Sequence, residues 1–177
     1  MKTVINLPEG VKARLEDYKV ILEGPKGSTS MKLKNPLAKV SIKDNEVIIE
    51  TPKDNRRCKT VMNTFKAHVL NMVKGVQEGY EARLRICYGH FPVTVKIEGQ
   101  IMIIENFSGE KVPRKARLMP DCEVKVQGSE IIINGLNKEL VGQTAANIEI
   151  ATKIKNKDLR IFQDGIWIIK KPGREGL

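Results

Sequence analysis

Short runs of alternating apolar and polar residues predict most of the regular structure of this chain. Such alternation is typical of half-buried β-strands, and β-branched residues dominate the runs. The predicted strand segments are VILEG at 20–24, VSIKDNEVIIE at 40–50, EARLRICYG at 81–89, IMIIEN at 101–106 and CEVKVQGSEIIIN at 122–134. Polar turns at 44–46 and 127–130 divide the two longest segments, which therefore predict β-hairpins.

Two further segments have the period of an amphipathic helix. The first helix is expected to begin after an Asp54 N-cap and to stop at Gly79. The second is expected to begin near Asn137. The predicted buried stripes are Val61, Phe65, Val69, Met72 and Val76 in the first helix, and Val141, Ala145, Ile148 and Ala151 in the second.

The two halves of the chain repeat the same order of elements. In each half a strand is followed by a hairpin and then by an amphipathic helix. We therefore predict an α+β fold of two similar, duplicated domains, each a mainly antiparallel sheet with one long helix packed on a face. The predicted domains are residues 1–79 and 80–177, with the C-terminal domain as the main nucleic-acid-binding domain.

The charge of the chain is unevenly distributed. The chain has 31 Lys and Arg against 21 Asp and Glu, a formal net charge of +10. Residues 80–150 carry nine basic and nine acidic residues, whereas residues 151–177 carry seven and three. A cationic surplus gathered on one short, structured segment favours a polyanion such as nucleic acid as its partner.

This distribution selects the first candidate binding residues. They form two groups. One group extends from the second helix into a strand predicted to follow it, and the other lies at the end of the last strand. A tight hairpin turn at Asp164–Gly165 is expected to bring both groups toward one surface. Lysines supply mobile charges and arginines supply planar forks for phosphate. The candidates are Lys153, Lys155, Lys157, Arg160, Lys170, Lys171 and Arg174, together with Gln143, which either binds RNA or caps its own turn. Arg56, Arg57 and Lys59 are expected to be a solvated helix face.

No residue set suited to catalysis is evident. His68 falls in the first helix and His90 in a predicted turn, neither with a Cys or carboxylate at ligand spacing. The cysteines are odd in number and widely spaced, which argues against a disulfide framework and against a zinc site; they are Cys58, Cys87 and Cys122. Cys58 lies among charged residues and is expected to be the most exposed of the three. We expect no enzyme activity, cofactor, metal or small-molecule substrate.

Known nucleic-acid modules fit poorly. The sequence Gly24-Pro25-Lys26-Gly27 matches the GxxG loop of KH domains, but it follows a strand and fits a turn better. The paired aromatic residues of RRM domains have no counterpart, so base stacking is not expected to carry most of the affinity. Recognition of the shape and phosphates of folded RNA or a duplex is expected instead.

The sequence does not predict membrane association. No apolar run approaches the roughly 18 residues of a spanning helix. The N-terminal segment turns polar at Pro8–Glu9, which does not suit a signal peptide. A cytoplasmic location is the default expectation.

Two segments near the C-terminus resemble the C-terminal region of the large-subunit ribosomal protein L-six family: VGQTAANIE at 141–149 and DLRIFQDGIWIIKK at 158–171. The resemblance is to the archaeal and eukaryotic type of this family, which is called L-nine in the eukaryotic scheme. Further similarity at 22–28, 54–76 and 80–93 extends the resemblance over nearly the whole chain, and an archaeal-type source is expected. One departure is Trp167, where the family usually has Tyr.

The resemblance implies a structural constituent of the large ribosomal subunit that binds its rRNA near the sarcin–ricin loop and the factor-binding region, mainly through the C-terminal domain. Neighbouring ribosomal proteins and translation factors are the other implied partners. The loop at 106–115 resembles a family loop, which makes Lys111, Arg114 and Lys115 second-rank candidates. Two alternatives stay open: a basic protein-interaction scaffold not bound to rRNA, and a nucleic-acid enzyme, for which no metal set or base is found.

Overall fold

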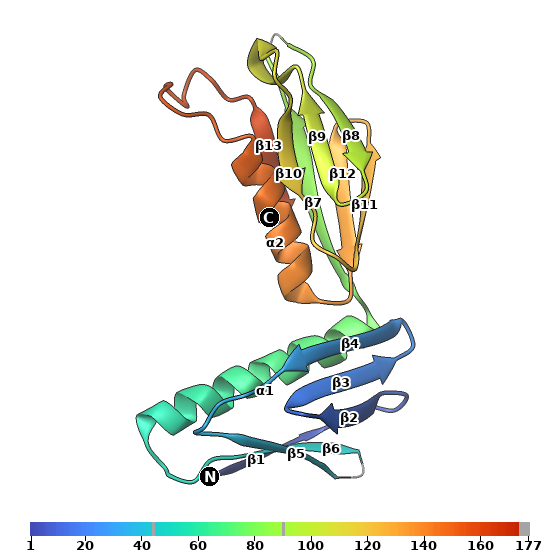
Figure 1. Cartoon of the computed structure of the whole chain (residues 1–177), viewed down its shortest axis with the longest axis vertical. Coiled ribbons are helices and arrows are strands. Elements are labelled where there is room, and N and C mark those ends of the chain that lie inside the picture. The colour runs from blue at the N-terminus through green and yellow to red at the C-terminus, as the bar shows by residue number, and fades with distance from the viewer. Residues whose placement is uncertain (44, 90, 174–177) are drawn as a thin grey trace. The chain divides into compact units, whose positions relative to one another are not determined.

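The computed structural model describes residues 1–43, 45–89 and 91–173, and the chain forms two compact units (Figure 1). We call Met1–Gly79 unit 1 and Tyr80–Leu177 unit 2. Asp44 of the predicted turn at 44–46, and His90 and Arg174 named above, lie outside the described residues.

Unit 1 combines two three-stranded antiparallel sheets with the helix α1. One sheet has the strand order β1-β6-β5 and the other the order β2-β3-β4. The strands are β1 (Lys2–Asn6), β2 (Lys12–Glu16), β3 (Lys19–Gly24), β4 (Gly27–Lys32), β5 (Lys39–Lys43) and β6 (Glu46–Glu50). The predicted hairpin at 40–50 is confirmed as β5 and β6, and the GxxG sequence is the turn between β3 and β4.

The helix α1 (Arg56–Gln77) begins one residue later than predicted. Asn55, not Asp54, is the N-cap: its side-chain oxygen accepts a hydrogen bond from the Cys58 N–H at 2.8 Å. This bond satisfies one of the main-chain donors that the first turn leaves unpaired. Asp54 forms an ion pair with Lys59 instead, at 2.9 Å.

The apolar stripe of α1 faces the core of unit 1, where the helix contacts β3, β4 and β6. The predicted residues Phe65, Val69, Met72 and Val76 are buried, and Val61 is partly buried. The expectation that Cys58 is the most exposed cysteine is wrong, because this side chain is 1% exposed. Cys58 lies four residues before the buried Met62 and therefore shares its helix face.

Unit 2 repeats this plan with one additional strand. Its sheets have the orders β11-β12-β7-β13 and β10-β9-β8, and all neighbouring strands are antiparallel. The strands are β7 (Tyr80–Cys87), β8 (Thr94–Glu98), β9 (Ile101–Glu105), β10 (Arg114–Arg117), β11 (Cys122–Gln127), β12 (Glu130–Gly135) and β13 (Gly165–Lys170). A short 3-10 helix, η1 (Phe107–Gly109), follows β9.

The strand orders make the duplication visible. The arrangement β1-β6-β5 in unit 1 corresponds to β7-β12-β11 in unit 2, and β2-β3-β4 corresponds to β8-β9-β10. In both units the helix follows the last of these strands. The predicted α+β fold with duplicated domains is confirmed, although each unit contains two sheets. In unit 2, β13 adds to the side of β7 that β12 leaves open.

The helix α2 (Lys138–Ala151) packs against β7, β10, β12 and β13 (Figure 1). Its N-cap is Asn137, as predicted, with the side chain accepting from the Glu139 N–H at 2.9 Å. Val141, Ala145 and Ile148 are buried as predicted, and Ala151 is partly buried. This packing fixes the C-terminal end of α2 beside the start of β13.

Candidate nucleic-acid interface

The residues between α2 and β13 form a loop, not the predicted strand. We call residues 152–164 the basic loop. The predicted hairpin turn at Asp164–Gly165 is also wrong, because Gly165 opens β13, and β13 pairs with β7. Asp164 Oδ1 accepts a hydrogen bond from the Gly89 N–H at 2.6 Å, which ties the loop to the residues after β7. The open edge of β7 pairs with β13 along the strand, with one register shift between Ile168 and Lys170, so β13 needs no partner strand from the basic loop.

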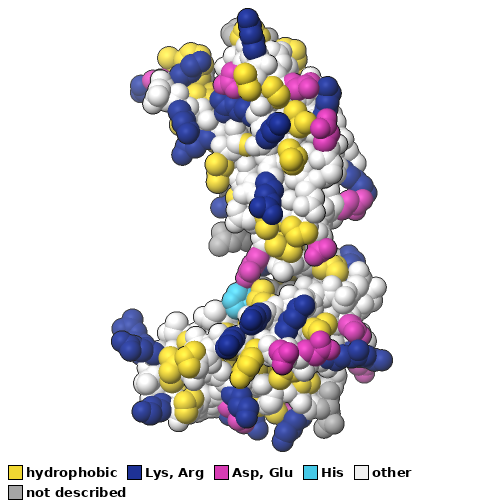
Figure 2. Space-filling view, in the orientation of Figure 1, with side chains coloured by type: hydrophobic (Ala, Val, Ile, Leu, Met, Phe, Trp, Pro, Cys, Tyr) yellow, Lys and Arg dark blue, Asp and Glu magenta, His cyan; other side chains and the backbone are white. Residues whose placement is uncertain are grey.

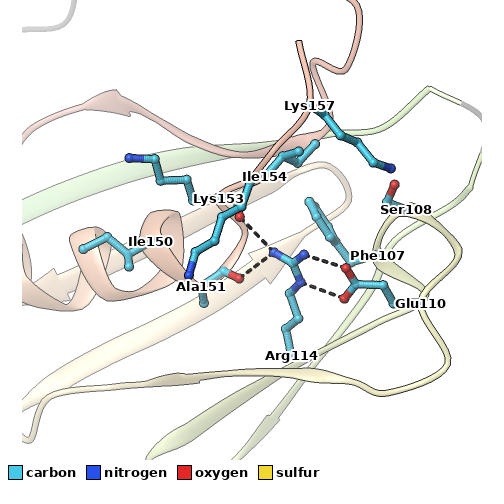
Figure 3. Close-up of a pocket in the computed structure, with 10 residues that line it drawn as sticks. Phe107, Ser108, Glu110, Arg114, Ile150, Ala151, Lys153, Ile154 and Lys157 are labelled. Atoms are coloured by element: carbon cyan, nitrogen blue, oxygen red, sulfur yellow. Dashed lines mark hydrogen bonds and ion pairs between the residues drawn. The ribbon is translucent and has the colours of Figure 1, made fainter. Parts of the chain in front are cut away.

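Cations concentrate on this part of unit 2. Figure 2 shows Lys and Arg side chains gathered on the loop that Figure 1 draws between α2 and β13. A cavity of about 330 Å³, which we call the basic cavity, lies between the basic loop, the end of α2 and the loop around η1 (Figure 3). Its lining includes four cations from two separate segments, namely Arg114, Lys153, Lys155 and Lys157.

Arg114 lines this cavity and donates four hydrogen bonds to other groups of the protein (Figure 3). Its guanidinium donates to both carboxylate oxygens of Glu110, at 2.6 and 2.8 Å. It also donates to the carbonyls of Ala151 and Lys153, at 3.1 and 3.2 Å, where α2 has ended and left carbonyls unpaired. Its carbon Cζ lies 4.3 Å from the centroid of the Phe107 ring. Arg114 therefore builds the cavity wall.

The electrostatics of the cavity follow from this pairing. The hydrogen bonds from Arg114 lower the pKa of Glu110, and the same bonds raise the pKa of Arg114. The carboxylate of Glu110 is thus ionised and neutralised by Arg114. The three lysines that line the cavity are exposed, and within the described residues no carboxylate forms an ion pair with them. The lining carries a surplus of positive charge that suits a phosphate group.

Two of the other candidates have intramolecular partners nearby. Arg160 forms a forked ion pair with Asp158, with Nη2 and Oδ2 2.8 Å apart, although its side chain remains 90% exposed. This pairing raises the pKa of Arg160 and lowers that of Asp158. Gln143 donates to the Asn147 side chain one helical turn later, at 2.8 Å, rather than capping its own turn.

The last predicted group lies at the other end of β13. Lys170 Nζ donates to Glu81 Oε1 at 3.1 Å, and Lys171 is exposed after the strand. A strand rises about 3.3 Å per residue, so the start and end of β13 are about 17 Å apart. The structure therefore does not bring Lys170 and Lys171 onto the basic cavity. Arg174 lies outside the described residues.

The second-rank lysines are close to Arg114 in sequence. Lys111 lies between η1 and β10, Lys115 lies on β10, and both are exposed. Gly109 adopts a positive φ of 76°, and a Cβ atom there would lie 3.3 Å from the Phe91 ring, so this residue serves the turn.

Exposed aromatic residues in unit 2 were not anticipated. Tyr88 falls within the strand segment predicted at 81–89, but it is exposed because β7 ends at Cys87. Phe91, Phe162 and Trp167 are also exposed. The ammonium of Lys157 lies 4.6 Å from the centroid of the Phe162 ring, a cation–π contact. Nothing in the hydropathy pattern distinguishes these rings from core residues, because Phe162 belongs to no periodic segment and Trp167 belongs to an apolar strand.

The described residues contain neither a candidate metal site nor a candidate membrane-spanning helix. No group of three or more His, Cys, Asp or Glu side chains there is arranged to hold a metal ion. No helix of the described chain combines the length and the apolar character that a membrane crossing requires.

Comparison with known proteins accords with this architecture. The family model described as Ribosomal protein L6 matches the chain twice, at residues 7–79 and 91–165, once in each unit. The chain is 45% identical over 167 residues to the Large ribosomal subunit protein uL6 of Methanosarcina mazei, covering 94% of this chain and 95% of that protein. It is 44% identical over 174 residues to the protein of the same name from Natronomonas pharaonis, covering 98% of each.

A third relative, again named Large ribosomal subunit protein uL6, comes from Methanobrevibacter smithii and is 43% identical over 167 residues, or 94% of each chain. All of these organisms are archaea, in agreement with the expected archaeal type. A constituent of the large subunit is associated with the RNA and with other proteins of that particle. The chain therefore belongs to the Ribosomal protein L6 family and is a structural, non-enzymatic constituent of the large ribosomal subunit in the cytoplasm.

Proposed function

We propose that unit 2 binds large-subunit rRNA near the sarcin–ricin loop and the factor-binding region, with the basic cavity as its main phosphate-binding site. The observation that carries this proposal is that Lys153, Lys155 and Lys157 all line one cavity, whose carboxylate, Glu110, is paired with Arg114. The proposed location within the rRNA rests on the family resemblance. The same resemblance is the reason for proposing translation factors as partners.

The architecture suits a rigid clamp on folded RNA. Arg114 fixes the carbonyls of residues 151 and 153, so the lysines start from an ordered main chain. Their long side chains can then adjust to phosphates whose positions are set by the RNA fold. Three further residues are proposed to contact RNA around the cavity, because they are exposed and close in sequence to residues that line it; they are Arg160, Lys111 and Lys115. Lys170, Lys171, Arg174 and Gln143 are retained as proposed contacts of lower rank.

Binding to an RNA that contains the sarcin–ricin stem-loop tests the proposal. The variant replaces Lys153, Lys155 and Lys157 by alanine. Each lost phosphate contact should lower the slope of log K against log salt by about 1, so the slope should fall by about 3. The matched control replaces Arg56, Arg57 and Lys66, three exposed cations of α1 in unit 1, by alanine.

The proposal predicts a large loss of affinity for the lysine variant and a small one for the control. The reverse order would assign the interface to unit 1. Equal binding of the wild type to a scrambled hairpin of the same length would reject the sarcin–ricin location. A wild type that binds no RNA, yet associates with an acidic protein independently of salt, would favour the protein-interaction scaffold.

A further inference from the structure

A second cavity adjoins the basic cavity. It has a volume of about 280 Å³ and shares three lining residues with the basic cavity, namely Ile150, Lys153 and Ile154. Its remaining apolar lining comes from Leu159 in the basic loop and from Ile166 and Trp167 in β13. We call it the apolar cavity. One short segment at the end of α2 therefore separates a cationic site from an apolar one.

The polar side chains of the apolar cavity already have main-chain partners. Thr152 Oγ1 accepts from the Ile166 N–H at 3.0 Å, and Glu149 Oε1 accepts from the Ile168 N–H at 3.1 Å. Asp164 Oδ1 is bonded to the Gly89 N–H. These bonds hold the walls together, and the lining also presents apolar surface and the Lys153 ammonium to a ligand. Such a pair of features suits a molecule with an apolar body beside an anionic group.

Trp167 gives this site an ordered aromatic ring. Its side chain is 41% exposed, and Nε1 donates to the Gln163 carbonyl at 3.3 Å. The indole lies against Gly165, where an added Cβ would come within 2.9 Å of Cε2 and Nε1. Only a residue without a side chain leaves room for the ring in this position. The indole is therefore held before any partner arrives.

The geometry points to a binding site for one unstacked nucleotide of the bound RNA, with its base in the apolar cavity beside Trp167 and its phosphate on the lysines of the basic cavity. This inference rests on the proposed function and adds base contact to phosphate contact. Every nucleobase has a flat face that can stack on an aromatic ring. A protein side chain fits less well, because lysine is depleted in the core of protein–protein interfaces. Lys153 lines the apolar cavity, and Lys155 and Lys157 line the adjoining basic cavity.

The test uses the fluorescence of Trp167, which is the one tryptophan of the sequence. The probes are a short oligoadenylate and a ribose-phosphate oligomer of the same length that lacks bases, so the two carry equal charge. The oligoadenylate should quench Trp167 and bind about fivefold more tightly or better, the low end of what stacking on one base contributes. The oligomer without bases should bind with the same salt slope and leave the fluorescence unchanged.

Two variants of the full chain locate the effect. Trp167→Ala should remove the preference for oligoadenylate while preserving the salt slope, and Trp167→Phe should keep the preference. Gly165→Ala should weaken the preference too, because the added Cβ displaces the indole. Ile169→Ala is the matched control, since Ile169 is another exposed apolar residue of β13 and does not line the cavity. Circular dichroism of each variant checks that unit 2 is folded.

Equal binding of the two oligomers by the wild type, or an undiminished preference in Trp167→Ala, would overturn the inference. Loss of association with a neighbouring ribosomal protein in Trp167→Ala, with RNA binding intact, would do the same and assign the cavity to a protein partner. Failure of the proposed function looks different: neither oligomer then binds, and the lysine variant behaves like the wild type toward the sarcin–ricin RNA.

Discussion

The Arg114 guanidinium and the Glu110 carboxylate form a two-pronged ion pair, with N–O distances of 2.6 and 2.8 Å, on the wall of the basic cavity. The other side of the same guanidinium holds the carbonyls of Ala151 and Lys153. One side chain thus connects the loop after η1 with the end of α2. The position of the cavity lysines depends on this connection, and two predictions follow from it.

Arg114→Ala should destabilise unit 2 by about 1 to 3 kcal/mol, because two carbonyls and a carboxylate lose a charged donor. Urea unfolding followed by Trp167 fluorescence measures the free energy of unit 2. Lys115→Ala is the control on the same strand, where an exposed side chain is lost and the change should stay within about 0.5 kcal/mol. Equal stability of the two variants would show that Arg114 does not support the cavity wall.

The same ion pair predicts a dependence of stability on pH. Arg114 holds the pKa of Glu110 below its usual value, so the pair contributes its stability at pH values above the usual glutamate range of about 4.3. That contribution is lost as the pH falls through the lowered pKa of the folded state. Glu110→Gln should therefore be less stable than the wild type at neutral pH, and the difference should shrink in acid. A difference that is constant over this pH range would contradict the prediction.

Much of the fold could be predicted because its strands and helices have clear periods. The alternation at 101–106 and 122–134 corresponds to β9, β11 and β12, and the helical stripes correspond to α1 and α2. The shift of the first N-cap from Asp54 to Asn55 has a local cause, since either residue can cap a helix. Strands such as β10, with sequence RKAR, escape prediction because charged residues occupy all but one of its positions.

The candidate site could be predicted only in part. Composition identified Lys153, Lys155 and Lys157, because charge is a property of the sequence. The role of Arg114 could not be foreseen, because the carbonyls that it holds are 37 and 39 residues away in the chain. The expected hairpin at Asp164–Gly165 failed for a similar reason: the partner of β13 is β7, which lies much earlier in the sequence. Such pairings depend on which sheet edge is open.

Gly24→Ala should destabilise unit 1 by about 1 to 3 kcal/mol, the usual cost of overpacking. A Cβ at Gly24 would lie 2.7 Å from Val76 Cγ2 and 3.0 Å from the Val76 carbonyl oxygen, at the end of α1. Hydrogen exchange of the β3 amides measures the effect in unit 1, which contains no tryptophan. Ser28→Ala, at an exposed position of β4, is the control and should leave exchange unchanged. Unchanged exchange in Gly24→Ala would mean that α1 can move away from β3 at little cost.

Thr152 joins α2 to β13 through a buried hydroxyl. The side chain is 2% exposed, accepts from the Ile166 N–H at 3.0 Å and donates to the Glu149 carbonyl at 3.1 Å. Thr152→Val keeps the shape of the side chain but leaves the Ile166 N–H buried without its partner, which should cost about 1 to 3 kcal/mol. Thr152→Ser keeps the hydroxyl and loses one methyl group, which should cost about 0.8 kcal/mol.

The comparison of these two variants separates the contribution of the Thr152 hydrogen bond to stability from the contribution of its methyl group. Hydrogen exchange of the Ile166 amide should accelerate in Thr152→Val and stay close to the wild-type rate in Thr152→Ser. Urea unfolding should rank the wild type first, Thr152→Ser second and Thr152→Val last. If Thr152→Val is instead the more stable variant, burial of the methyl group outweighs the hydroxyl, and the link between α2 and β13 depends on apolar contact.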